Sequence, residues 1–484
     1  MPKRLLDVGR VTAPIRIIDT QGKVFEYVAL SHCWGAESTL TSTKSNWKKL
    51  SSNIPFSALS PLFQDAIIIT RQLGLRYIWI DSLCIIQDSA RDWETESSKM
   101  GIIYENSYVT ISATTASNGN DHCLRDRRKP VKLQMQDTTG KELEIRARKI
   151  INHHPTKMDG EPAKPMGRLT SRAWTLQEHV LSTRILHYTE TELLFECKTS
   201  FRCECAPLRK PYPTTPALIP KAIAKKSKRS EAVWEAWHRI VEQYSTRDLT
   251  VSDDKLPAIS GIAAKIQAAT ESMYIAGLWQ DNLASDLLWS TSAVQAPDAQ
   301  YFALDKYRAP TFSWASLNTA ITYPCFDEEE SQLLVPSIKL VSSSIKVAGL
   351  NPYGAVSEGS ITVLGPTIHA ILSSSQREDG WEYVLHIKGT SCITISHDCL
   401  LVEDTMESTS TSAVQTMRRA KCGDILSQCK VSVLCLGVAR YDTCISGLVL
   451  GKAGGGVTCW SRLGTFSAGS EVFKYAKDEE VCIL

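Results

Sequence analysis

Polar residues follow two apolar segments near the start of the chain, at positions where a binding or catalytic site could form. Ser31, His32 and Gly35 come at the end of the first segment, and Asp81 directly follows the second. In an open α/β sheet, ligands bind outside the carboxyl ends of the strands. A histidine there could act as an acid or contact a ligand, and a glycine would let a ligand approach the backbone closely. These four residues are the first candidates for a site.

A second group of candidates lies further along the chain, and each member also has a structural interpretation. Arg172 could clamp a phosphate or carboxylate, and Glu178 offers a carboxylate of its own. The two could equally form a structural ion pair, or Glu178 could pair with Arg184. Trp174 could stack on a base, although a tryptophan near apolar strands usually belongs to the core. Asp81 could likewise cap the segment that follows it, and a single histidine beside a core strand is more often structural.

The cysteines do not predict a metal site. Cys197, Cys203 and Cys205 cluster in the sequence, but a structural zinc site needs four ligands, commonly from two separated pairs. His187 is weakly placed as a fourth ligand. Most of the 15 cysteines lie instead in apolar, strand-like stretches, which predicts reduced and buried thiols, as at Cys33, Cys84, Cys435 and Cys482.

Familiar nucleotide and hydrolase motifs are absent from the sequence. No G-x-x-x-x-G-K-[ST] run encodes a P-loop, and no G-x-G-x-x-G follows an early strand. No G-x-S-x-G elbow supports an α/β-hydrolase. These absences disfavour an ATP-driven switch, a Rossmann oxidoreductase and a serine hydrolase.

The candidate residues need a scaffold, and the first ~200 residues alternate strand and helix patterns. The predicted strands are 25–32, 77–80, 108–113, 184–188 and 192–196. The predicted helices are 58–73, which Gly74 ends, 91–104 and 172–181. Ser89 and Asp92 suggest a capping box, and Glu94 and Glu96 are predicted to face solvent. The pattern predicts a parallel α/β sheet with helices on its faces.

The rest of the chain has a different character. A basic stretch at 221–229 is predicted to be a solvated linker or an exposed helix start, and 234–244 and 257–289 have helical patterns. From about residue 312, short alternating segments predict a β-rich region with a flexible loop at 404–415. We therefore expect an α/β domain at 1–205, a helical companion region at 206–310 and a β-rich C-terminal domain at 311–484.

Composition restricts the partners. The net charge of +2 gives no electrostatic case for binding nucleic acid or a membrane surface. The first ten residues lack the apolar core of a secretory signal, and no apolar run approaches the ~20 residues needed to cross a bilayer. We expect a cytoplasmic protein with neither nucleic acid nor membrane as partner.

Three long motifs, in order and at fitting spacing, resemble the fungal heterokaryon incompatibility (HET) domain family. They are YVALSHCWG at 27–35, the segment from YIWIDSLC to VTISAT at 77–114, and SRAWTLQEHVL at 171–181, which RILHY follows at 184–188. Further stretches at 244–250, 254–261 and 308–316 resemble the companion region of long HET proteins. Two departures are Ile86-Gln87, where many members have Asn-Gln, and a turn at 118–124 that matches only loosely.

This resemblance implies a role in vegetative incompatibility, in which HET proteins trigger cell death when unlike hyphae fuse. It also implies a flavodoxin-like sheet distantly similar to TIR domains, several of which cleave NAD. Their catalytic glutamate lies in a motif resembling Trp-x-x-x-Glu, and Trp174–Glu178 has that form. By this analogy Glu178 is the leading catalytic candidate, with Asp81 beside it. Ser31, His32, Gly35, Trp174 and Arg172 would then bind NAD, which is a possible substrate, and no cofactor or metal is required.

Other functions stay open. The domain could be a non-enzymatic signalling module that acts through self-association or through an allelic protein partner. A HET-like protein could also have been recruited to another pathway, such as specialised metabolism. An enzyme requires Glu178 near Asp81 and His32 at the carboxyl edge of the sheet, whereas an interaction module would leave Glu178 exposed or ion-paired.

Overall fold

The computed structural model describes most of the chain and divides it into two compact units. The described residues are 1–9, 13–35, 39–125, 131–147, 167–204, 215–224, 229–291, 302–324, 334–378, 380–388, 390–406, 414–453 and 458–484. The first unit comprises Met1–Arg229 with Arg247–Leu249, and the second comprises Ser230–Thr246 with Thr250–Leu484. The division into three domains predicted above stays a prediction. The centres of the predicted linker and loop, 225–228 and 407–413, lie outside the described residues.

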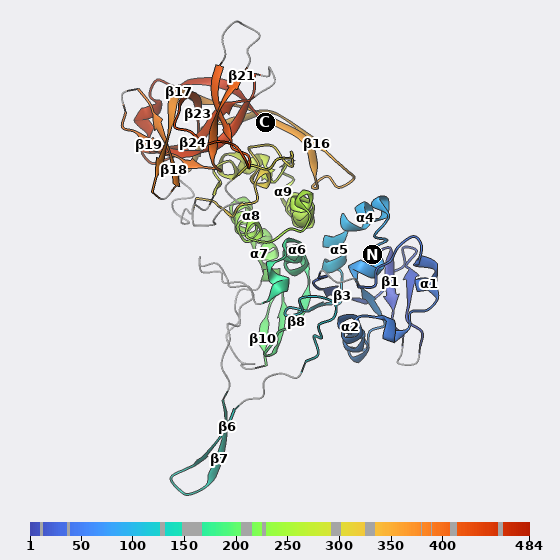
Figure 1. Cartoon of the computed structure of the whole chain (residues 1–484). Coiled ribbons are helices and arrows are strands. Elements are labelled where there is room, and N and C mark those ends of the chain that lie inside the picture. Colours follow the sequence, from blue (N-terminus) through green and yellow to red (C-terminus); the bar gives the residue numbers. More distant parts are fainter. Residues whose placement is uncertain are drawn as a thin grey trace. The chain divides into compact units, whose positions relative to one another are not determined.

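The first unit is built on an eight-stranded mixed sheet (Figure 1). Its strand order is β10 (Phe201–Cys203), β9 (Leu193–Cys197), β8 (Arg184–Tyr188), β5 (Val109–Ser112), β3 (Tyr27–Ser31), β4 (Tyr77–Trp79), β1 (Arg4–Asp7) and β2 (Arg16–Asp19). The central strands β8, β5, β3 and β4 pair in parallel, and the strands at both edges pair antiparallel. The α/β prediction is confirmed at this level.

Helices cover both faces of this sheet, because its central strands are apolar on both sides. In β3 all five side chains are buried. Val28 and Leu30 face a core that also contains Leu62 and Phe63 of α2 (Pro61–Gln72), while Tyr27 faces a second core. That second core also includes residues of α3 (Asp81–Cys84) and α5 (Met100–Glu105). The remaining helices of this unit are α1 (Trp47–Ser52), α4 (Ala90–Ser97), α6 (Ala173–Leu181) and α7 (Leu218–Ala224).

The start of α4 differs from the sequence prediction. Ser89 makes no side-chain cap, and Asp92 instead pairs with Arg4 and, at 3.3 Å, with Lys3. Glu96 is fully buried and accepts a hydrogen bond from the backbone N–H of Lys3 at 3.0 Å. The prediction that Glu96 faces solvent is therefore wrong, because Lys3 and Arg4, at the start of β1, supply the partners of both acids.

The crossover from β5 to β8 contains a separate hairpin and α6. The hairpin pairs β6 (Val131–Gln136) with β7 (Glu142–Ala147). Helix α6 begins after Arg172, and at its end the Ser182 hydroxyl donates to the Glu178 carbonyl at 2.6 Å. This helix brings the Trp174–Glu178 motif onto the sheet.

The second unit combines helices with a large sheet, and its β-rich C-terminal region is as predicted. The helices are α8 (Arg229–Ser245), α9 (Ser260–Thr270) and α10 (Leu283–Asp286). The ten-stranded sheet contains β15 (Val335–Pro336), β16 (Lys339–Val347), β17 (Val356–Arg377), β18 (Gly380–His386), β19 (Ile393–Thr394), β20 (Ser396–His397), β23 (Lys430–Tyr441), β24 (Cys444–Lys452), β25 (Trp460–Gly469) and β26 (Lys477–Ile483). A smaller sheet pairs β21 (Leu401–Met406) with β22 (Val414–Arg419).

Segment 257–289 is not one helical stretch. After α9 the chain forms a short hairpin of β11 (Tyr274–Ile275) and β12 (Leu278–Trp279) before α10. The turn between these strands holds Ala276 at φ 47° and Gly277 at φ 102°, a left-handed conformation that ends a helix. The apolar spacing in this stretch therefore reflects burial of short elements rather than a helical face.

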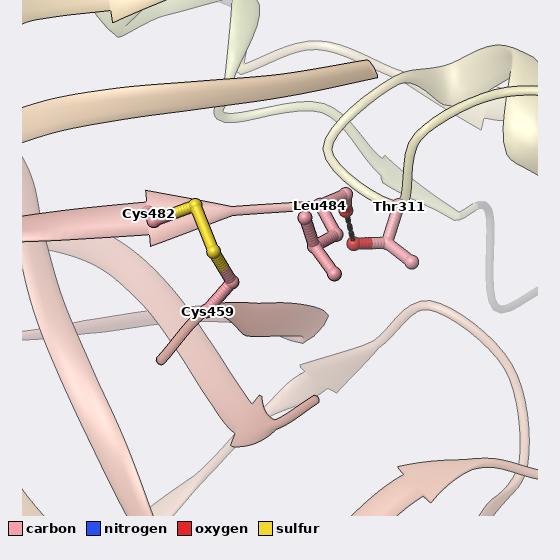
Figure 2. Close-up of a disulfide and its surroundings, with 4 residues drawn as sticks. All are labelled: Thr311, Cys459, Cys482 and Leu484. Atoms are coloured by element: carbon pink, nitrogen blue, oxygen red, sulfur yellow. Dashed lines mark hydrogen bonds between the residues drawn. A yellow bond between two sulfur atoms is a disulfide. The ribbon is translucent and has the colours of Figure 1, made fainter. Parts of the chain in front are cut away.

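Figure 2 shows a disulfide between Cys459 and Cys482 in the second unit. The prediction of a reduced thiol is wrong for Cys482, although Cys33, Cys84 and Cys435 are free and buried as expected. The physical reason is the pairing of Trp460 in β25 with Ile483 in β26. This pairing places the two neighbouring cysteines 4.7 Å apart at their Cα atoms. Among the described residues, no helix is long and apolar enough to cross a membrane.

Candidate functional site

The carboxyl ends of β3 and β5 form the floor of a pocket in the first unit. Ser31 and Ser112 stand opposite each other at these ends. The next strand in the sequence after β3 is β4, which pairs with β3 on the side away from β5. The strand order therefore reverses between β3 and β5. Ligands in open α/β sheets bind at such a reversal. The pocket holds about 330 Å³ of empty space, solvent at its mouth included, and its lining includes Ser31, Ser112, Glu178, His179, His187 and Arg247.

Glu178 is buried at this pocket, with 5% of its surface exposed. Its Oε2 atom has no hydrogen-bond partner among the residues that the structure describes. Burial raises the pKa of Glu178 to about 7, and Asp81 adds to the rise, while Ser31, Arg172 and Tyr104 favour the ionised form and lower it. Glu178 is therefore a buried acid that can change its charge near neutral pH.

Asp81 stands where the sequence placed it, directly after β4 and at the start of α3. Its Oδ2 accepts a hydrogen bond from the Trp34 indole at 2.8 Å, and its Oδ1 accepts one from the Ser82 backbone N–H at 2.7 Å. The carboxylate thus caps the segment that follows and also contributes to the field at Glu178. The two interpretations given to Asp81 are both compatible with its position.

His32 is almost fully buried beside Asp81. Its Nδ1 lies 3.7 Å from the Asp81 carboxylate, and its Nε2 is without a hydrogen-bond partner in the described part of the chain. Burial lowers the pKa of His32, which favours the neutral imidazole. A purely structural histidine would have both ring nitrogens satisfied, so the unpaired nitrogen keeps this residue among the candidates.

Arg172 lies just before α6 and brings positive charge to the same place. Its Nη1 donates to the His32 carbonyl at 3.0 Å, and its charge lowers the pKa of Glu178. Arg184, the other suggested partner of Glu178, instead donates to the Tyr108 carbonyl and lies over the Tyr108 ring. Burial raises the pKa of Cys33, so this thiol is not an activated nucleophile.

Gly35 and Trp174 have structural explanations. Gly35 adopts φ 74°, and a Cβ atom there would stand 2.3 Å from the Cβ of Asn118. The close approach that the glycine permits is thus with its own chain, and contact with a ligand stays a prediction. Trp174 is half-buried and packs against the core that contains Tyr104, so its role in stacking a base also stays a prediction.

Several residues at the site were not predicted from the sequence. Tyr104 donates to the Leu30 carbonyl at 3.0 Å and favours ionisation of Glu178. Arg247 donates to the Arg172 carbonyl at 3.2 Å and to the Thr175 hydroxyl at 3.1 Å. The signal for Arg247 was its place in the stretch 244–250, one of the segments that resemble HET proteins, but no local pattern ties it to α6. Its neighbour Asp248 forms an isolated β-bridge with Arg172, and this long-range backbone pairing positions Arg247.

The cysteine cluster does not form a metal site in the part of the chain that is described. Cys197 and Cys203 lie on β9 and β10 and belong to no group of metal-capable side chains there. Cys205, the third member, lies outside the described residues.

Comparison with models of protein families gave a match in the first unit. Residues 27–178 match the family model described as Heterokaryon incompatibility protein (HET). This range begins with the first residue of β3 and ends at Glu178, and it therefore spans all the residues predicted from the sequence as site residues. Searches of curated proteins and of solved structures found no match.

Proposed function

We propose that the first unit, whose residues 27–178 match the heterokaryon incompatibility family model, is a cytoplasmic effector of non-self recognition that triggers cell death by hydrolysing NAD. Glu178 is the catalytic carboxylate of this proposal. The TIR-like relation that suggests NAD is part of the proposal and rests on the Trp174–Glu178 motif.

The observation on which the proposal rests is the state of Glu178. A buried carboxylate without a partner for one oxygen is costly to the fold. Such groups concentrate at functional sites, where a ligand or transition state supplies the missing interaction. Glu178 has this character, because its Oε2 finds no partner in the described part of the chain and its pKa is about 7, and it lines the pocket at the sheet reversal.

The sheet supports the proposal at the level of topology. Across the sheet, the four parallel strands follow the order β4, β3, β5 and β8. Numbered by their place in the sequence, this order is 2-1-3-4, with which a flavodoxin-like sheet begins. In this proposal the nicotinamide riboside end of NAD enters the pocket that Glu178 lines, with the adenosine end outside.

The chemistry assigns a role to each nearby group. The bond between C1′ of the ribose and the nicotinamide nitrogen breaks, and its electron pair leaves with nicotinamide. Ionised Glu178 stabilises the oxocarbenium-like charge, and water adds to C1′ and releases a proton, which gives ADP-ribose. We assign Asp81 and Ser31 to the ribose hydroxyls and Arg172 to a phosphate. His32, with its unpaired Nε2, would contact the ligand.

The test compares Glu178→Gln with a matched control, Glu26→Gln, which changes an exposed glutamate away from the pocket. Purified proteins are assayed for nicotinamide release from NAD, with and without forced dimerisation. We expect the wild type and Glu26→Gln to release nicotinamide, and Glu178→Gln to lose at least about a hundredfold in kcat with its fold intact by circular dichroism. Turnover in Glu178→Gln equal to the wild type would reject Glu178 as the catalytic group.

A second candidate function, a homotypic interaction module, is favoured by the β6–β7 hairpin. The pairing of β6 with β7 places five exposed apolar side chains on one face of the hairpin: Val131, Leu133, Met135, Leu143 and Ile145. Polar residues occupy the other face, where Lys132 pairs with Glu144 at 3.1 Å. A two-stranded hairpin is marginally stable alone, and a second copy of the same uncharged face would bury both.

Sedimentation velocity tests this alternative with Leu133→Lys against Gln134→Lys, which adds the same charge to the opposite face of the strand. If the hairpin pairs two copies, the wild type and Gln134→Lys sediment as dimers at micromolar concentration, and Leu133→Lys sediments as a monomer. A wild type that stays monomeric throughout would remove this candidate.

A further inference from the structure

Three metal-capable side chains meet beside the pocket without any role in the proposed hydrolysis. His179 comes from α6, His187 from β8 and Glu196 from β9. One ligand atom from each lies within 4.8 Å of the others. The sequence alone does not reveal this group, because the seven residues between His179 and His187 and the eight between His187 and Glu196 give no familiar ligand spacing.

The geometry of the group is specific. The Nε2 atoms of His179 and His187 lie 2.6 and 3.0 Å from the same oxygen, Oε2 of Glu196. Only 3% of His187 and 1% of Glu196 are exposed. The other carboxylate oxygen, Oε1, accepts a hydrogen bond from the Thr215 backbone N–H at 2.8 Å. This hydrogen bond fixes the carboxylate, as outer contacts do around metal ligands.

We infer that His179, His187 and Glu196 form a binding site for a divalent transition metal of the zinc class. Two histidines and a glutamate are the ligands of one known type of catalytic zinc site, in which the fourth position stays open for water or a ligand oxygen. His179 and His187 both line the pocket, so the open position faces it. The site adds a Lewis-acidic ion next to Glu178 and goes beyond the proposed function.

Ordinary ion pairing accounts less well for this group. His122 pairs with Asp65 at 3.1 Å, and His238 pairs with Asp286 at 2.7 Å. In each of these pairs one histidine meets one carboxylate. Glu196 instead meets two imidazoles, so that three ligand atoms from three elements gather within 4.8 Å of one another.

The experiment measures metal binding by the full chain after removal of metal with a chelator. The protein is dialysed against Zn²⁺, and bound zinc is counted by mass spectrometry. A parallel sample takes Co²⁺, whose visible absorption reports tetrahedral ligands. His179→Gln and His187→Gln remove one ligand each, and His238→Gln is the matched control, because it changes a histidine of a single ion pair.

We expect the wild type and His238→Gln to bind one equivalent of zinc and to gain thermal stability with it. His179→Gln and His187→Gln should bind at least about tenfold more weakly and lack the cobalt bands. His179 is the less buried of the two and gives a second variant if His187→Gln fails to fold. No stoichiometric zinc in the wild type, or equal binding in all variants, would overturn the inference.

Glu178→Gln separates this inference from the proposed function. It should bind zinc like the wild type while losing NAD turnover. Zinc binding without NAD turnover in the wild type would support the metal site and reject the proposed hydrolysis. NAD turnover without zinc binding would support the proposed hydrolysis and reject the metal site.

Discussion

Two buried acids, Asp398 in the second unit and Glu178 in the first, differ in how their carboxylates are bonded. In the second unit, Asp398 is buried between Arg462 and Arg419, and the Nε of Arg462 donates to it at 2.9 Å. Arg462 also donates to the carbonyls of Leu287 and Trp289, and its guanidinium lies 3.5 Å from the centre of the Trp289 ring. Every nitrogen of Arg462 and both oxygens of Asp398 are thus used.

In the first unit, Glu178 is buried almost as deeply but lacks such partners. The Nη1 of Arg172 is directed to the His32 carbonyl, and Oε2 of Glu178 is left without a partner among the described residues. A buried charge with all its hydrogen bonds made is compensated within the fold, whereas one left incomplete is a cost that folding alone does not explain. The difference separates a structural ion cluster from a candidate active site.

The largest effect is expected at Asp398, because both of its oxygens are bonded to buried arginines. Asp398→Asn removes the counter-charge of Arg419 and Arg462, and the second unit should lose about 3–5 kcal/mol of unfolding free energy. Urea unfolding measures this, with Asp478→Asn, which changes an exposed aspartate of β26, as the control. A loss below about 1 kcal/mol would show that the cluster is not structural and would end the contrast with Glu178.

The sheet and part of the site could be predicted from the sequence because they depend on local signals. The apolar runs that became β3 and β4 are typical of parallel strands buried on both faces. Since the carboxyl ends of parallel strands meet at one edge, Ser31 and Asp81 could be expected near each other. The helical spacing of 172–181 then predicted the helix that presents Glu178.

The remaining features depend on partners distant in the sequence. The strand β1 was missed because Arg4 and Asp7 flank only two apolar residues, and Arg4 is buried only through its pairing with Asp92. The disulfide depends on the register of β25 and β26. The group of His179, His187 and Glu196 depends on the pairing of β8 with β9, which no spacing rule shows.

A smaller effect should follow from removing the charge of Glu178. Its pKa is about 7 in the fold and 4.5 in its ordinary state, so the fold favours the protonated form. The associated stability is fully present below pH 4.5 and is lost as the pH rises to 7. Glu178→Gln, which stays neutral, should therefore be more stable than the wild type above pH 7 by about 3 kcal/mol, with little difference below pH 4.5.

Amide hydrogen exchange in β3 and β5 measures this difference within the first unit, from pH 5 to pH 8 and in chelator-treated protein, since a cation at His179 would favour the ionised carboxylate. Glu26→Gln is the control, because its carboxyl is exposed and its substitution should leave the pH dependence unchanged. A difference between Glu178→Gln and the wild type that stays constant with pH would mean that Glu178 is ionised throughout. Its missing hydrogen bond would then be supplied within the fold, and the contrast with Asp398 would disappear.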